Sequence, residues 1–221
     1  MGASAGLNLL FDRYAYRYVL GDGVVHAGAP FSPVEIDAAC RVASGAGLPL
    51  ALPPIASRTG IDLNPVDLAE EDAYAWLRAL IWPEDPDRVQ RLAAARTLWQ
   101  AHPPVLVQGD AVDALPALLA AVDEDATPVV FHTHVLNQFT PAAADELEAI
   151  FGRHASMRPI HRLGNDLGGG TAKQYALRLR VYQGDALQET VLGYTDAHAR
   201  RIEWLGEGRG ARGEGRGARG E

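Results

Sequence analysis

The chain has 221 residues, of which 48% are hydrophobic, and this is enough to bury one sizeable core. Its formal net charge of −8 gives no general attraction for nucleic-acid phosphates. No uninterrupted apolar run reaches the ~18 residues of a membrane span, and Cys40 is the only cysteine, which excludes an internal disulfide and a cysteine-based metal cage. We therefore predict a cytoplasmic protein with no nucleic-acid or membrane partner.

The first half of the chain combines a glycine-rich turn, tyrosines that alternate with smaller residues, and two stretches of helical spacing. Gly21-Asp22-Gly23 supplies the turn of a hairpin, and Pro83 ends the first long helix. In chain order, the predicted elements are a turn at 2–6, a short helix at 7–11, a hairpin over 14–25, a strand within 55–63, and helices at 68–82 and 88–100.

Strands and helices alternate regularly in the second half. Pro141 suits the first position of a helix, and Thr140 is its expected cap. We predict strands at 104–107, 128–132, 159–163, 175–182, 189–194 and 201–205, and helices at 115–122 and 141–151. This order favours an α/β fold of Rossmann type, with a mostly parallel sheet, helices on both faces and an antiparallel hairpin near the C-terminus. Four tryptophans on these elements are expected in the core: Trp76, Trp82, Trp99 and Trp204.

Residues 1–205 are expected to form one domain, followed by a tail at 206–221. The tail repeats Gly-Glu-Gly-Arg-Gly-Ala-Arg from Gly206 and again from Gly213. It has no large apolar residue to offset its ordering entropy, so we predict disorder. An Arg-Gly nucleic-acid-binding segment is the competing interpretation, but the tail has no aromatic residue to stack on bases and its glutamates nearly balance its arginines.

Candidate ligand-binding residues follow the predicted strands, because ligands of open α/β sheets bind beyond the carboxyl ends of the strands. The glycine turn offers free backbone N–H groups, and acids or polar side chains follow each later strand. The candidates are Gly2, Ser4, Gly6, Asn8, Asp62, Asp110, His132, His134, Asn137, Gln138, Asn165 and Asp166. Taken singly, each has a structural interpretation, since glycines make turns, Asp62 precedes Asn-Pro, and Asp110 could cap a helix.

The pair His132 and His134 also raises a metal hypothesis. Residues i and i+2 on a strand point to the same side, and Asp166 or His161 could add a ligand. No acid lies in the same cluster, so the third ligand would have to come from elsewhere. A metal-assisted hydrolase using these two histidines therefore remains a competing hypothesis, as does acid–base use of either imidazole.

Several motifs resemble a bacterial family known only as domain of unknown function 2332. They are the segments 2–14 (GASAGLNLLFDRY), 58–67 (RTGIDLNPVD), 76–84 (WLRALIWPE), 109–111 (GDA) and 129–136 (VVFHTHVL). The resemblance runs from Gly2 to about Leu205. The order of these motifs also looks like that of class I methyltransferases, which use S-adenosylmethionine.

By this second resemblance, the loop from Gly2 to Gly6, with Ser4 and Asn8, would cradle the methionine part of the cofactor. Asp62 would hold the ribose, Asp110 would lie near the adenine, and His132 would also belong to the cofactor site. The segment from His134 to Gln138 would line the substrate side, with His134 and Asn137 as the catalytic residues. The implied function is methyl transfer to a small molecule or a protein side chain. A non-catalytic or degenerate nucleotide-binding module is the alternative.

Two departures from the resemblance matter. Family members carry a strand before the glycine motif, where this chain has Met1, so we expect the first strand of the sheet to be missing. Residues 13–58 separate the glycine motif from Asp62, whereas such a loop and its ribose acid are usually about 20 residues apart. We predict that this insertion is a lid or an elaboration on the substrate side.

Overall fold

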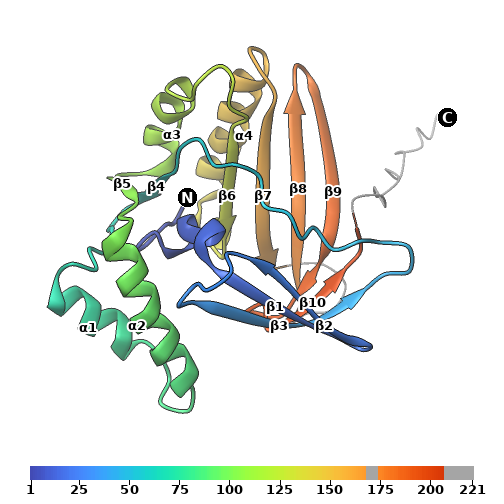
Figure 1. Ribbon diagram of the computed structural model, residues 1–221. Helices are drawn as coiled ribbons and strands as arrows, with labels where there is room; N and C mark the ends of the chain where they lie inside the picture. Colours follow the sequence, from blue (N-terminus) through green and yellow to red (C-terminus); the bar gives the residue numbers. More distant parts are fainter. Residues whose placement is uncertain (168–173, 207–221) are drawn as a thin grey trace.

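The computed structural model describes residues 1–167 and 174–206, whose elements follow one another largely in the predicted order (Figure 1). The strands are β1 (Ala15–Leu20), β2 (Gly23–Gly28), β3 (Glu35–Val42), β4 (Thr59–Asp62), β5 (Val105–Gln108), β6 (Val129–Thr133), β7 (Ile160–Leu167), β8 (Tyr175–Gln183), β9 (Ala186–Thr195) and β10 (Arg201–Trp204). The helices are α1 (Glu71–Ala79), α2 (Pro86–Ala101), α3 (Ala111–Ala120) and α4 (Pro141–Ala155), with 3-10 turns η1 (Leu7–Arg13) and η2 (Leu136–Gln138). The predicted disordered tail lies outside the described residues, apart from Gly206.

The described strands form an eight-stranded sheet in the order β2-β1-β3-β10-β9-β8-β7-β6 and a separate parallel pair, β4-β5. The large sheet is mixed rather than mostly parallel. Parallel pairing joins β1 to β3, β3 to β10 and β6 to β7, whereas β2, β8 and β9 run antiparallel to their neighbours. The α/β class is thus confirmed, and so is the C-terminal hairpin of β8 and β9.

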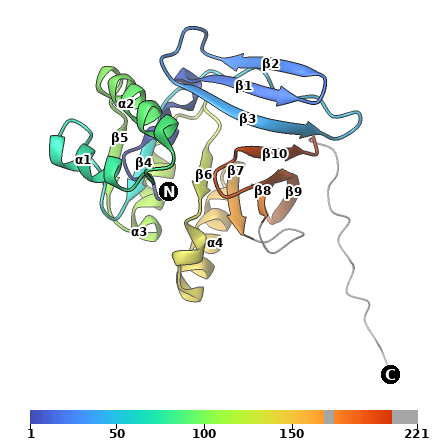
Figure 2. The ribbon, with the colours of Figure 1, turned by 90° about the horizontal axis from the view of Figure 1, so that it is seen from below.

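The 13–58 insertion supplies three strands of the large sheet. Its hairpin, β1 and β2, agrees with the predicted one, but β3 was not predicted, although it joins the hairpin to β10. Figure 2 shows these strands crossing the end of the β6–β9 layer at a steep angle. Arg58 closes the insertion by binding the Asp12 carboxylate through two hydrogen bonds of 2.6 and 2.9 Å. Hydrogen bonding to Arg58, together with the charge of its guanidinium, lowers the pKa of Asp12.

The N-terminal residues lie between β4 and β6 in both views (Figures 1 and 2). The backbone nitrogen of Met1 donates to the Phe131 carbonyl of β6 at 2.8 Å. On the other side, the amide of Ala3 donates to the Ile61 carbonyl of β4 at 3.0 Å. The parallel pair β4-β5 is therefore joined to the large sheet through the glycine-rich turn.

Three apolar clusters hold these layers together. One lies between α3, α4 and strands β6–β8, and it includes Leu147 and Phe151. A second packs α2 against η1, where the Trp99 indole donates to the Ala5 carbonyl at 2.8 Å. The third lies where β3, β9 and β10 meet, and it contains Trp204. Within the described residues, no helix is both long and apolar enough to cross a membrane.

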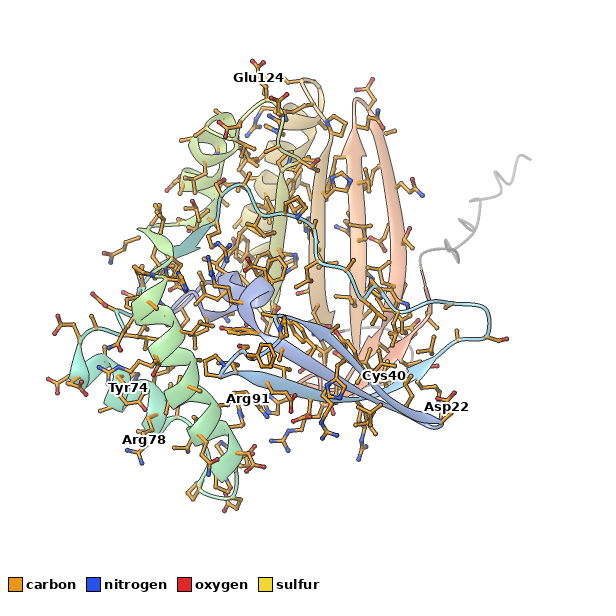
Figure 3. The ribbon with its side chains drawn as sticks, viewed as in Figure 1. Asp22, Cys40, Tyr74, Arg78, Arg91 and Glu124 are labelled. Carbon is orange, nitrogen blue, oxygen red and sulfur yellow. The ribbon has the colours of Figure 1, made fainter. Side chains whose placement is uncertain are left out.

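The prediction that all four tryptophans are core residues is wrong for two of them. Trp99 and Trp204 are buried, but Trp76 is 66% exposed and Trp82 is 75% exposed. Helix α1 buries none of its residues fully, and its Tyr74 and Leu77 pack, partly buried, against the second cluster. Figure 3 shows Tyr74 and Arg78 on this helix and Arg91 on the neighbouring α2. The Arg91 side chain donates to the Glu35 carbonyl at 3.1 Å and so ties α2 to β3.

Candidate functional site

Two of the predicted motifs meet where β4 ends. The amide of Ser4, in the glycine turn, donates to Oδ2 of Asp62 at 2.7 Å. The amide of Asn64 donates to the other carboxylate oxygen at 2.9 Å. A carboxylate can accept about four hydrogen bonds, so each oxygen of Asp62 keeps a lone pair for a further donor.

The glycine turn is strongly curled. Gly2, Ser4 and Gly6 have φ angles of +64°, +51° and +73°, in the left-handed region that residues other than glycine rarely adopt. At both ends of the turn there is also no room for a side chain larger than that of glycine. A Cβ at Gly2 would run into Val135, and one at Gly6 would lie 2.7 Å from the ring of Pro104. The turn therefore touches the segment after β6 and the start of β5.

Asp110 lies beside this turn but has a structural role. The amide of Gly109 donates to the Asp62 carbonyl at 2.9 Å, which brings the two loops together. The Asp110 carboxylate caps α3 by accepting from the amide of Val112 at 2.8 Å. One of its oxygens remains for other donors. We call the glycine turn 2–6, Asp62, Asp110 and residues 134–138 the carboxyl edge.

His134 is held in an unusual conformation at this edge, with a φ of +57°. Its Nε2 lies 3.0 Å from the Ala197 carbonyl, and its ring contacts that of Tyr175 edge-on at 4.4 Å between centroids. A carbonyl can only accept, so Nε2 carries the proton and Nδ1 of the neutral ring keeps its lone pair. Asn137, on η2, and Asn8, on η1, are both exposed.

His132 points away from the carboxyl edge. Its side chain is fully buried beside Arg162 and Asp166 of β7. Phe131 instead faces η1 and contacts the ring of Phe11, because neighbours on a strand point to opposite faces. The two histidines of the metal hypothesis therefore contact different groups: His132 contacts Arg162 and Asp166, and His134 contacts the Ala197 carbonyl. Among the described residues, no three or more His, Cys, Asp or Glu side chains are grouped so that they could hold a metal ion.

Around His132 lies a network of charged side chains from four elements. Arg162 of β7, which is 5% exposed, donates from Nε to Nε2 of His132 at 3.2 Å. Its Nη1 bonds to Glu148 of α4 at 2.5 Å and to the Tyr182 hydroxyl at 3.1 Å. Tyr182 in turn donates to the second oxygen of Glu148 at 2.8 Å. Such a buried network is stable only when its groups are paired.

The network continues outward along β8. Arg180 donates to Glu148 at 2.9 Å and to Glu189 at 2.5 Å. Burial alone raises the pKa of Glu148, but the hydrogen bonds from Arg162 and Tyr182 and the nearby arginine charges outweigh it, so the pKa is lowered. Burial likewise raises the pKa of Asp166, and the bond from His132 and the charges of Arg162 and Arg178 lower it overall. Both carboxyls are therefore ionised at neutral pH.

These side chains surround a cavity of ≈ 210 Å³. Gly164 leaves room for it, since a Cβ there would lie 2.8 Å from Cε1 of His132 and 2.9 Å from Oδ2 of Asp166. We call this cavity the arginine pocket. Its lining consists of His132, Leu136, Glu148, Arg162, Gly164, Asp166, Arg178 and Arg180.

Sequence reasoning found His132 and Asp166 but missed the other charged residues of the pocket. Arg162, Arg178 and Arg180 alternate with apolar residues on β7 and β8, which resembles an ordinary strand with one solvated face. The only available signal was that Arg178 and Arg180 lie two residues apart on one face of a strand.

A larger and more open groove lies between the insertion and β10. Its volume is ≈ 960 Å³, and it is lined mainly by small and apolar residues of β1, β3 and β10 and by the loop at 46–50. Cys40 and Asp22 lie along it, at the end of the molecule remote from α1 and α2 (Figure 3). Burial raises the pKa of the Cys40 thiol, which makes this cysteine a weak nucleophile.

Comparison with known families adds one match, to the family described as "uncharacterized protein conserved in bacteria", over residues 1–204. The chain belongs to this DUF2332 family. The resemblance inferred from the motifs is thus confirmed, and the match covers the carboxyl edge, the arginine pocket and the 13–58 insertion alike. Neither curated proteins nor solved structures gave a match.

Proposed function

We propose that this DUF2332 chain binds S-adenosylmethionine at the carboxyl edge and transfers its methyl group to a small-molecule or protein acceptor. The observation that carries the proposal is the bond between the Ser4 amide and Asp62. It joins a glycine turn to an acid at a strand end 58 residues away, which is the pairing that holds nucleotide cofactors in open α/β sheets.

The arrangement of strands supports the same site. Along one line lie β5, β4, the N-terminal residues, β6 and β7, with β4-β5 and β6-β7 each parallel. The order of strands on the two sides of the glycine turn is like that of the class I methyltransferase core. The continuation of the sheet through β10 and β3 to β1 and β2 is a departure from it.

The residues present fit such a cofactor. When bound, S-adenosylmethionine supplies an electrophilic methyl group on a sulfonium. The amides of Ala3, Ser4 and Gly6 already donate within the protein. The amides of Gly2 and Ala5, beside Asn8, would hold the carboxylate of the cofactor. The unused lone pairs of Asp62 would accept from the ribose hydroxyls. The second oxygen of Asp110 would accept from the adenine amino group.

The segment after β6 would serve the acceptor. Nδ1 of His134 keeps a lone pair because Nε2 donates to the Ala197 carbonyl, so this nitrogen can take the proton that the acceptor loses on methylation. The neighbouring Asn137 offers an exposed amide for positioning the acceptor. Most of the rate enhancement would come from positioning of the two reactants.

Calorimetric titration of S-adenosylmethionine into the chain tests the proposal. We expect binding in the micromolar range. Asp62→Ala should weaken it at least about tenfold, because a lost hydrogen bond to a charged group costs about 1.5–3 kcal/mol. Absence of binding to folded protein would refute the proposal.

Asp67→Ala is the matched control for this titration. Asp67 also accepts from a backbone amide two residues further on, that of Ala69 at 2.8 Å, and it is exposed. The Asp67→Ala variant loses a hydrogen bond of the same kind but keeps the one between Asp62 and the glycine turn. It should therefore bind the cofactor as tightly as the unaltered chain. Equal weakening in the two variants would mean that Asp62 acts only on the loop.

A further inference from the structure

Helix α1 and the turn that follows it present three large apolar side chains to solvent. Trp76, Leu80 and Trp82 are each more than half exposed. Leu80 comes four residues after Trp76, so the two side chains are neighbours on one side of the helix, and Trp82 follows shortly after. A single exposed apolar residue is common on a protein surface, whereas a group of them marks a binding surface. Tryptophan also contributes strongly to binding energy at protein interfaces.

The opposite side of α1 is anchored to the rest of the molecule. Tyr74 packs against the second apolar cluster, and the Arg96 guanidinium lies 4.2 Å from the centre of its ring. The same arginine binds Glu71 at 2.7 Å. The turn after the helix is closed by the Asp85 amide, which donates to the Trp82 carbonyl at 3.0 Å. The exposed side chains are thus carried by a fixed backbone, which reduces the entropy lost when a partner binds.

The same stretch of chain is strongly acidic. Residues 67–87 contain seven acidic residues and one basic residue, Arg78. Two of the acids pair with arginines outside this stretch, Glu71 with Arg96 and Asp85 with Arg200. The other five are exposed, and no ion pair joins them to another described residue: Asp67, Glu70, Asp72, Glu84 and Asp87. We call the exposed side of residues 67–87 the tryptophan face.

Charge and apolar surface together select the partner of the tryptophan face. Nucleic acids and anionic membrane surfaces are negatively charged and would be repelled. In a two-fold dimer through this face, each copy would set its carboxylates against the identical carboxylates of the other. The chain's own tail at 206–221 has no large apolar residue, and its glutamates nearly balance its arginines. A protein segment with both basic and apolar side chains fits the face, because cations also bind over indole rings.

We propose that the tryptophan face binds a protein segment that is rich in arginine or lysine and also carries apolar side chains. The apolar side chains cover Trp76, Leu80 and Trp82. The basic side chains lie beside Glu84 and beside Asp72, which is one helical turn before Trp76. The negative charge of the face also attracts such a segment before contact is made. This inference does not depend on binding of S-adenosylmethionine.

Fluorescence anisotropy of a labelled peptide tests the proposal. The probe is a short peptide in which arginine alternates with leucine, and the matched peptide has glutamate in place of each arginine. We expect saturable binding of the arginine peptide to the full chain. Its affinity should fall several-fold when the salt concentration rises from about 0.1 M to about 1 M, because the screening length shortens from about 10 Å to about 3 Å. The glutamate peptide should not bind.

Two variants of the tryptophan face separate the apolar contact from the charge. Trp82→Ala should raise the dissociation constant of the arginine peptide at least about tenfold, because tryptophans at interfaces are frequent hot spots. Asp72→Asn removes one charge and keeps the shape of the side chain, so it should raise the dissociation constant several-fold. Both residues are exposed, and both variants should therefore unfold in urea like the parent chain.

Met157→Ala and Glu124→Gln are the matched controls for apolar contact and for charge. Met157 is 74% exposed, and the next residue, Arg158, donates to the Asp123 carbonyl at 3.0 Å. The two control positions are therefore close together. Figure 3 shows Glu124 at the opposite end of the molecule from Tyr74 of α1. Neither control should change the dissociation constant of the arginine peptide.

Several results would overturn the proposal. The arginine peptide could fail to bind, or the glutamate peptide could bind as tightly. Glu124→Gln could weaken binding as much as Asp72→Asn does, which would mean that the attraction follows only the net charge of the chain. Self-association in sedimentation that Trp82→Ala abolishes would assign the face to a second copy, and tighter binding of a labelled oligonucleotide would assign it to nucleic acid. Because the titrations contain no S-adenosylmethionine, none of these outcomes bears on methyl transfer.

Discussion

The carboxyl edge and the arginine pocket meet at the segment that follows β6, which contributes Leu136 to the pocket, yet they are built differently. At the edge, carboxylates of Asp62 and Asp110 accept from backbone amides, and these groups are partly or fully exposed. In the pocket, side chains from β6, α4, β7 and β8 bind one another in the interior. Substitutions at the edge should therefore alter ligand binding more than folding, and those in the pocket should alter folding first.

Replacing Arg162 by methionine should have the largest effect on stability. Methionine keeps an unbranched chain over the Phe151 ring, which the guanidinium covers at 5.3 Å. It leaves Nε2 of His132 and the Tyr182 hydroxyl without their donor and Glu148 with one arginine fewer. Breaking a buried ion pair from one side costs about 3–5 kcal/mol. We expect Arg162→Met to lower the free energy of unfolding in urea by roughly 3 kcal/mol, the lower end of this range, because Glu148 is partly exposed.

Arg153→Met separates burial from charge in this comparison. Arg153 binds Glu146 at 2.7 Å on the same helix that carries Glu148, but its side chain is 61% exposed. Exposed pairs contribute about 0–1 kcal/mol, so this variant should unfold nearly like the parent chain. Equal losses for the two arginines would break the distinction between pocket and surface.

Gly164→Ala should have the second largest effect. The backbone at Gly164 allows any residue, so the cost comes from the new methyl group, which would lie 2.8 Å from Cε1 of His132. Overpacking of this kind costs about 1–3 kcal/mol. The same methyl group should displace His132 from Arg162, and this would appear as a shift of the His132 nitrogen resonances.

Gly152→Ala is the matched control for the added methyl group. Gly152 lies in α4, and a Cβ there would meet nothing within 4 Å. Alanine in a helix is about 0.5–1 kcal/mol more favourable than glycine, so this variant should be more stable than the parent. Destabilisation by both substitutions would show that α4, rather than the pocket, is sensitive to added volume.

The carboxyl edge shows what local patterns can predict. The turn Gly2–Gly6, the strand ending at Asp62 and the cap at Thr140 each depend on a few neighbouring residues, and the structure has them where the sequence places them. The structural alternative for Asp110, a helix cap, also holds. These features are encoded within one turn or one strand end, so no knowledge of the fold is needed.

The arginine pocket and β3 show where local patterns fail. The strand β3 is rich in alanine, which has a low preference for strands, and it is stabilised by its neighbours β1 and β10. Arg162 on β7 resembles a solvent-facing residue until Glu148, 14 positions earlier, is brought over it by α4. For Trp76 and Trp82 the error is the opposite one, since they were predicted to be buried and are exposed. An apolar pattern on a helix does not show whether another element covers it.

The smallest expected effect tests whether charge, and not hydrogen bonding alone, holds the pocket together. Burial raises the pKa of Glu148, but its bonds to Arg162 and Tyr182 and the arginine charges lower it overall. A folded-state pKa below the unfolded one means that the folded chain binds fewer protons. The resulting stability is complete above the unfolded value of about 4.3 and is lost as the pH falls through the folded value.

Glu148→Gln keeps an acceptor for Arg162 but removes the charge. Because the Glu148 side chain is 40% exposed, solvent screening limits the loss to below about 1 kcal/mol. The difference in urea unfolding free energy between parent and variant should be constant from pH 7 to about 5 and should shrink below about pH 4, where the parent carboxyl becomes protonated. A difference that does not change with pH would mean that the shape of the Glu148 side chain, rather than its charge, organises the arginine pocket.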